Sequence, residues 1–247
     1  MPAIKDDALV LRRLDYSESS QILVVLTRTH GLRRLIAKGA KRSTKTRFVP
    51  GIDLLERGWV VFLPGSRSDS HLGTLTEWLQ TEAYLGLRTA LPQWYAAQYA
   101  ADVTVAAMEE AEPHVDLFDA LAGLLGALSA GRSPLPEVVG YQCALLRSLG
   151  LWPDLSRCVL CDRVAPPGRA AYYGFHQGGL VCSQCVPAAG QVRKVGAAVL
   201  TSLRESDWPP DTVGPALALL DETLRHLIGR GTLLAKLDQG KVGSKQV

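Results

Sequence analysis

Two pairs of cysteines constrain this chain more than any other feature of its sequence. Cys158 and Cys161 form one C-x2-C motif, Cys182 and Cys185 form a second, and 20 residues separate the two motifs. A two-residue spacer in a tight turn lets both thiolates face one cation, and two such turns supply four soft ligands at about 2.3 Å. The spacing therefore predicts one Zn²⁺ per chain. Because four thiolates leave no open position for water or substrate, its predicted role is structural.

Other interpretations of the cysteines remain open from the sequence. Two disulfides or four unligated thiols are less favoured, because thiols stay reduced in the cytosol. A redox role would require a strand-to-helix junction of a thioredoxin-like unit, which neither motif shows. His176 lies between the pairs and could replace one thiolate, although four cysteines already complete the shell. Cys143 shares a helix face with Val139 and Leu146, which indicates a small core residue without a function.

The first third of the chain has the pattern of short strands. Five runs rich in Val, Ile, Leu and Thr alternate with turn residues. They are Ala8–Leu11, Gln21–Thr27, Leu32–Ala37, Trp59–Leu63 and Leu72–Trp78. This count predicts a five-stranded OB-fold barrel, although an SH3-like barrel would give a similar pattern.

From about Pro92 the apolar period becomes helical. Apolar residues recur at three- to four-residue spacing in five stretches. They are Tyr95–Ala106, Leu117–Leu128, Tyr141–Leu149, Val195–Leu203 and Leu217–Leu227. The cysteine region therefore interrupts a helical domain.

These patterns together predict an α+β multi-domain protein. We expect an OB-fold DNA-binding domain in residues 1–80 and the first part of an all-α helical domain in residues 81–150. A four-cysteine zinc module is expected as an insertion in residues 151–192. The helical domain then ends in residues 193–247, with a frayed tail.

The distribution of charge along the chain points to a polyanionic partner. Residues 1–80 carry 13 basic and 8 acidic side chains, whereas residues 81–150 carry 3 and 8. Between Arg28 and Arg47 there are eight basic residues and no acidic one. A flexible basic loop beside a barrel can follow a phosphate backbone, which binds by counterion release. The residues predicted to contact DNA are Arg33, Arg34, Lys38, Lys41, Arg42, Lys45 and Arg47.

A solvated charged surface is the alternative for this segment, but inert surfaces usually mix both signs of charge. Arg193 and Lys194 form a second, weaker candidate for DNA or partner contact, because they follow the cysteine module and are expected to open a helix. No recognition helix or RNP-type aromatic motif is visible, so sequence-specific binding is not predicted.

The sequence gives no sign of catalysis or membrane insertion. The phosphate-cradling, dinucleotide, zinc-protease and nucleophile-elbow motifs are all missing, and the histidines are scattered. We therefore predict a protein that is not an enzyme and has no small-molecule substrate. Two acids near the N-terminus argue against an export signal, and no apolar stretch is long enough to span a bilayer. A cytoplasmic, nucleoid-associated protein is expected.

The order of these features resembles the RecO family of bacterial recombination mediators. The similarity near the N-terminus lies in Leu9-Val10-Leu11-Arg12, Tyr16-Ser17-Glu18 and Ala37-Lys38-Gly39-Ala40-Lys41-Arg42. In the second half it lies in Leu145-Leu146, Gly150, Pro153, Gly178-Gly179 and the four paired cysteines. The resemblance extends to about Cys185, and the C-terminal helices are similar only in kind.

The resemblance implies binding of single- and double-stranded DNA, strand annealing and a role in DNA repair. It also implies partnership with RecR and help in loading RecA onto DNA coated by single-strand-binding protein. Two other hypotheses stay open from the residues alone. One is a nuclease or nucleotidyl transferase with a structural zinc ribbon, and the other is an accessory factor of transcription or translation.

Overall fold

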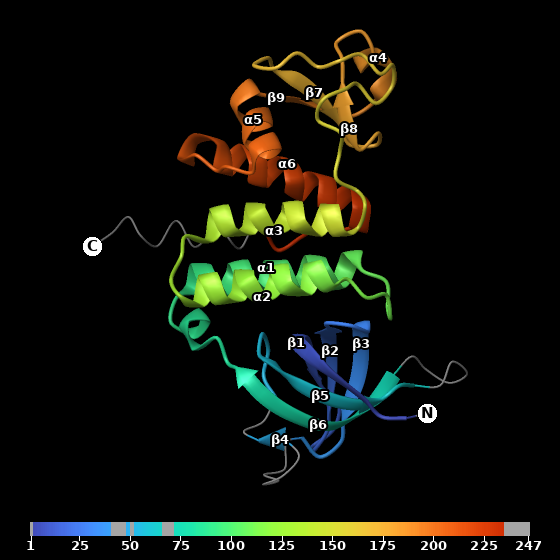
Figure 1. Ribbon diagram of the computed structural model, residues 1–247, viewed down its shortest axis with the longest axis vertical. Coiled ribbons are helices and arrows are strands. Elements are labelled where there is room, and N and C mark those ends of the chain that lie inside the picture. The colour runs from blue at the N-terminus through green and yellow to red at the C-terminus, as the bar shows by residue number, and fades with distance from the viewer. Residues whose placement is uncertain (1, 41–47, 50–51, 66–71, 235–247) are drawn as a thin grey trace. The chain divides into compact units, whose positions relative to one another are not determined.

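The computed structural model describes residues 2–40, 52–65 and 72–234, and the backbone of residues 48 and 49. Contacts divide these residues into two compact units, one that ends at Arg132 and one that spans Ser133–Leu234. Helices fall on both sides of this boundary (Figure 1). The four-part division expected from the sequence, at residues 80, 150 and 192, stays a prediction.

The first unit begins with a closed barrel. Its strands are β1 (Ile4–Asp15), β2 (Gln21–Thr27), β3 (Gly31–Ala37), β4 (Phe48–Val49), β5 (Arg57–Leu63) and β6 (Leu72–Glu82). Five of them follow the order β3-β2-β1-β5-β6, and β6 returns parallel to β3 to close the sheet. The two-residue β4 pairs with β6 only. The predicted five-stranded OB-type barrel is confirmed.

Strand β1 is much longer than its sequence pattern indicated. It pairs with β5 through its first half and with β2 through its second half, with a bulge between Val10 and Arg12. The apolar run in the sequence ends at Leu11 because the second half of the strand carries exposed charged residues. The second half of β1 can carry polar side chains because its outer face is in contact with solvent, while its backbone still pairs with β2.

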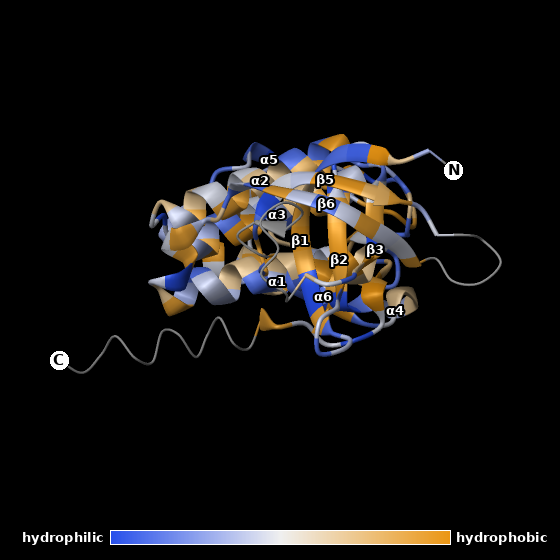
Figure 2. Cartoon of the chain, turned by 90° about the horizontal axis from the view of Figure 1, so that it is seen from below, coloured by the Kyte–Doolittle hydropathy of each residue, from blue (hydrophilic) through white to orange (hydrophobic). Residues whose placement is uncertain are grey.

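The barrel core follows from the alternation of side chains along each strand. Inward-facing residues of β1, β2, β3, β5 and β6 form one buried cluster, in which Phe62 is the largest fully buried side chain. Figure 2 shows hydrophobic residues, in orange, along β1 and β2.

Gly31 is required where β3 begins. Its φ is +69°, and a Cβ at this position would lie 2.1 Å from the carbonyl oxygen of Glu112. The adjoining segment is held by a hydrogen bond from the Ala111 N–H to the Leu32 carbonyl oxygen at 3.0 Å. A side chain at Gly31 would push this segment away from the barrel.

Helices complete the first unit, namely η1 (Leu85–Arg88), α1 (Leu91–Ala107) and α2 (Val115–Ser129). Pro92 lies in the first turn of α1, where its missing N–H has no partner to lose. Helix α2 buries an apolar stripe that includes Leu117, Leu121 and Leu128, so the helical period seen in the sequence is confirmed.

The second unit combines three longer helices with a small sheet. Its elements are α3 (Pro134–Ser148), β7 (Ala171–Gly174), β8 (Gly179–Val181), α4 (Val186–Ala189), β9 (Val192–Val195), α5 (Ala197–Glu205) and α6 (Pro210–Ile228). Helix α6 packs against both α3 and α5. Cys143 of α3 is buried, and burial raises the pKa of its thiol to about 12, as expected of a core residue.

Candidate metal centre and nucleic-acid interface

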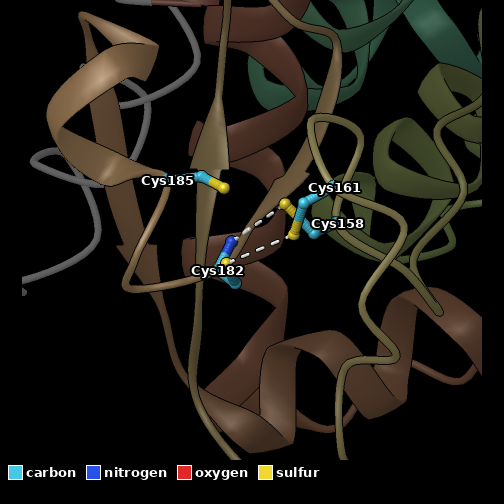
Figure 3. Close-up of side chains that lie close together, drawn as sticks. All are labelled: Cys158, Cys161, Cys182 and Cys185. Atoms are coloured by element: carbon cyan, nitrogen blue, oxygen red, sulfur yellow. Dashed lines mark hydrogen bonds between the residues drawn. The ribbon is translucent and has the colours of Figure 1, made fainter.

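The four paired cysteines converge on one point in the second unit (Figure 3). Their Sγ atoms all lie within 4.8 Å of one another. A tetrahedron of thiolates at a Zn–S distance of about 2.3 Å has edges of about 3.8 Å. The Sγ atoms of Cys161 and Cys182 are 3.7 Å apart. The cluster therefore has the dimensions of a four-thiolate metal site.

The first C-x2-C motif lies in a tight turn. The Cys158 N–H donates to the Arg163 carbonyl oxygen at 2.9 Å, and the Asp162 N–H donates to the Cys158 carbonyl oxygen at 2.9 Å. Asp162 has a φ of 58°, in the left-handed region, which turns the chain back. A further hydrogen bond, from the Val159 N–H to the Leu180 carbonyl oxygen at 2.8 Å, fixes this turn against β8.

The second motif follows directly from β8. Cys182 is the first residue after this strand, and Cys185 immediately precedes α4. The Cys185 N–H donates to the Cys182 carbonyl oxygen at 2.9 Å, which closes the turn. Cys158 and Val181 pack with Ala189 in a small apolar core beneath the sulfur atoms. The metal ligands thus come from two turns that one small sheet holds together.

Backbone groups favour a thiolate in this cluster. Burial alone would raise the pKa of Cys158, but N–H groups of Cys182, Leu160 and Cys161 lower it to about 6. In contrast, hydrogen bonds with the thiols of Cys182 and Cys161 raise the pKa of Cys185 to about 12. Four thiolates this close would repel one another without a cation between them. The donor set therefore fits a soft divalent metal ion.

The basic segment between Arg28 and Arg47 runs along β3 and continues beyond its end. Lys38 is exposed just beyond this strand. Four of the predicted DNA-binding residues lie outside the described residues, namely Lys41, Arg42, Lys45 and Arg47. Of the basic residues that follow β3, the structure therefore places Lys38 directly beside the barrel.

Arg33 and Arg34 differ in their surroundings, as neighbours on a strand should. The Arg33 guanidinium lies 5.9 Å from the ring centre of Phe62, and its Nε donates to the His30 carbonyl oxygen at 2.9 Å. Burial lowers the pKa of Arg33. Arg34 is exposed and forms an ion pair with Glu110 at 2.5 Å. Each arginine already has an intramolecular partner for its guanidinium.

Ion pairs also compensate other arginines of the first unit. Arg12 pairs with Asp102, Arg13 and Arg88 both pair with Asp53, Arg28 pairs with Asp119, and Arg57 pairs with Asp7. Their positive charge is therefore largely balanced at short range. Within the described part of the basic segment, the exposed Lys38 is therefore the residue whose positive charge is best placed to contact a phosphate.

The prediction that Arg193 and Lys194 open a helix is wrong. Both residues lie on β9, where Arg193 pairs with Tyr173 and Lys194 pairs with Tyr172 of β7. Helix α5 begins only at Ala197, after Gly196. Val195 fits the apolar spacing of the helix that follows, but its buried side chain belongs to the small sheet.

Arg193 and Lys194 also differ in whether the side chain already has a partner within the protein. Arg193 forms an ion pair with Glu222 and lies 5.8 Å from the ring centre of Phe175. Lys194 is exposed. Lys194 is therefore the better placed of the two to meet a polyanion.

Two basic residues that sequence reasoning omitted lie in the same module. Arg163 and Arg169 are exposed and line a groove of about 240 Å³ together with Tyr172 and Ser183. The signal was in the composition, since residues 151–195 carry five basic side chains and only two acidic ones. Averaged over residues 151–247, with 11 basic and 8 acidic side chains, this local excess is not apparent.

No helix within the described ranges is long and apolar enough to cross a membrane.

Comparison with known proteins agrees with this architecture. Residues 1–84 match the family model described as Recombination protein O N terminal, and residues 88–235 match the model described as Recombination protein O C terminal. The boundary between the two matches lies just after the barrel.

Similar proteins carry the name DNA repair protein RecO. One from Anaeromyxobacter sp. (strain Fw109-5) is 30% identical over 238 residues, with 92% of each chain covered. One from Bifidobacterium longum subsp. infantis is 33% identical over 238 residues, again with 92% of each chain covered. One from Rhodopirellula baltica is 30% identical and covers 83% of this chain and 77% of its own. This chain belongs to the RecO family of DNA repair proteins.

Proposed function

We propose that this protein acts in DNA repair as a DNA-binding recombination mediator without a chemical step of its own. It would bind single- and double-stranded DNA, promote strand annealing and, with RecR, help to load RecA onto DNA coated by single-strand-binding protein. The resemblance to the family is what suggests these partners and activities. Its place would then be the cytoplasm, in association with the nucleoid.

The observation that carries the proposal is the continuity of β3 with the basic segment. Strand β3 belongs to a closed barrel of OB topology, and such barrels bind nucleic acid on a face and in adjoining loops. Lys38 follows the end of this strand. In the sequence it is followed by Lys41, Arg42, Lys45 and Arg47, with no acidic residue among them. Phosphate contacts of this kind supply affinity without sequence preference.

We further propose that the cysteine cluster holds one structural Zn²⁺. Four thiolates would complete its coordination, and the sheet of β7, β8 and β9 would be ordered around it. When bound, the metal would contribute folding free energy to the second unit, because the ligands are assembled only in the folded chain.

Binding of labelled single- and double-stranded DNA at several salt concentrations tests the main proposal. We expect binding to both, with affinity that falls steeply as salt rises. A parallel assay for Mg²⁺-dependent cleavage addresses the alternative of a nuclease, which would need clustered carboxylates. Protein-dependent cleavage, or preference for RNA over DNA, would overturn the proposal.

A further inference from the structure

The second unit contains a cleft of about 580 Å³ that is separate from the cysteine cluster. Its walls come from the segment after α3, from the turn between β7 and β8, and from the last turns of α6. The volume lies within the range of roughly 300–1,000 Å³ that is usual for sites of small ligands. None of the predicted DNA-binding residues lines it.

One wall of the cleft is built from stacked rings. The imidazole of His226 lies flat on Phe175, with ring centres 4.9 Å apart and an angle of 9° between the planes. His176 meets His226 edge to face at 5.8 Å. Phe175 is buried, whereas both imidazoles are exposed. The buried ring therefore supports exposed rings that a ligand can reach.

Another wall presents the indole of Trp152. The guanidinium of Arg147 lies 4.3 Å from the ring centre of this half-buried residue. Arg147 is itself fixed by a hydrogen bond from its Nη2 to the Ser206 hydroxyl at 3.2 Å. Trp152 is thus held in place by a cation on its face, and this cation also adds positive charge near the cleft.

Gln177 and Thr223 can both donate and accept at the cleft, whereas two further groups there present acceptors. The Nδ1 of His226 lies 2.8 Å from the carbonyl oxygen of Glu222. Because a carbonyl oxygen only accepts, Nδ1 carries the proton, and Nε2 of the neutral ring keeps a lone pair. Asp154 also lines the cleft, and its Oδ1 accepts hydrogen bonds from the N–H and hydroxyl of Ser156. Its Oδ2 remains for a donor on a ligand.

We propose that this cleft binds one unpaired nucleobase of single-stranded DNA, with preference for a base that carries an exocyclic amine, such as cytosine or adenine. The exposed imidazoles of His176 and His226 and the half-buried indole of Trp152 offer flat surfaces against which a base can stack. The acceptors on His226 and Asp154 match an amine donor on its edge. An aliphatic peptide could donate N–H groups to these acceptors but would leave the ring planes without a stacking partner. The inference rests on the proposed binding of single-stranded DNA and names a second contact for it.

The test uses the zinc-loaded full chain and short single strands that contain one 5-iodocytosine. Photocrosslinks are expected in the peptides that hold residues 150–154, 175–178 or 223–227. Trp152→Ala should weaken binding by about five- to tenfold, and Trp152→Phe should stay within about twofold of the unchanged protein. The salt dependence should not change, because no phosphate contact is lost. Leu91→Ala, at an exposed site outside both the cleft and the metal site, is the control.

Several results would overturn the inference while leaving DNA binding in place. They are crosslinks confined to the barrel, wild-type affinity of Trp152→Ala, or equal loss in the Ala and Phe variants together with a lower temperature of unfolding. Normal DNA binding by Trp152→Ala together with lost binding to RecR or single-strand-binding protein would mark the cleft as a protein site instead. If the unchanged protein binds no DNA at all, the proposed function itself fails.

Discussion

The backbone N–H of Cys182 donates a hydrogen bond to the Sγ of Cys158 at 3.3 Å (Figure 3). One C-x2-C turn thereby stabilises the thiolate of the other across 24 positions of sequence. Hydrogen bonds of this kind orient ligands and tune their charge in metal sites. The two turns therefore form a single site, in which each depends on the other.

The first prediction follows from this dependence. Purified protein should contain about one Zn²⁺ per chain, and replacing any one of the four cysteines by Ser should lower both metal content and the stability of the second unit. Metal analysis and thermal unfolding measure the two effects. His176→Ala is the matched control and should keep its zinc, because His176 is not part of the cluster. Protein purified without chelator that holds no zinc would contradict the proposal.

The second prediction concerns the basic segment. Replacing Lys38, Lys41, Arg42, Lys45 and Arg47 together by Ala should weaken binding to all single-stranded sequences alike. Each lost phosphate contact changes the slope of log affinity against log salt by roughly 0.7, so the loss of five contacts should flatten the slope by about 3.5 units. Arg28→Ala is the control, because Arg28 is already paired with Asp119 and should change the slope little. A folded variant with unchanged affinity and slope would remove this segment from the DNA site.

The third prediction separates Arg193 from Lys194. Lys194→Glu should weaken DNA binding and reduce the salt slope without loss of stability, because this side chain is exposed on β9. Arg193→Glu should in addition lower the temperature of unfolding, because its new carboxylate would face Glu222. Fluorescence anisotropy and thermal unfolding distinguish the two effects. If a variant with both Arg193→Glu and Lys194→Glu binds DNA and RecR as the unchanged protein does, these two side chains are exposed to solvent without a role in binding.

The fourth prediction concerns a buried carboxylate in the barrel. Burial alone would raise the pKa of Asp6, but hydrogen bonds from His30 and Thr29 lower it below its ordinary value of 3.8. A lowered pKa means that ionised Asp6 stabilises the fold above about pH 4 and that this contribution is lost as the pH falls further. Asp6→Asn should therefore reduce the free energy of unfolding by about 1–3 kcal/mol near neutral pH.

The pH dependence supplies the check on this prediction. Urea unfolding at a series of pH values should show the difference between Asp6→Asn and the unchanged protein shrinking towards pH 3. Glu77→Gln, an exposed carboxylate on β6, should show no such difference at any pH. A constant destabilisation by Asp6→Asn over the whole range would mean that charge at Asp6 is not what stabilises the barrel.

Local pattern alone determined much of this protein. The two C-x2-C motifs indicated a four-thiolate site because the geometry of a metal ion sets both the spacing and the chemistry of its ligands. Strand β3 and the helices α2 and α6 were visible because one face of each must be buried, which imposes a period on the sequence. Strand β2 was visible as a run that is apolar almost throughout. Such features depend on residues close together in the chain.

Contacts between distant residues could be decided only by the tertiary structure. The run from Arg28 to Arg47 holds no acid, yet folding brings Asp119 to Arg28 and Glu110 to Arg34, which compensates half of the visible charge. Likewise Arg193 and Lys194 belong to a strand because β7, some 20 positions earlier, pairs with them. Pairing across a sheet and ion pairing across a fold depend on three-dimensional proximity, which no local period records.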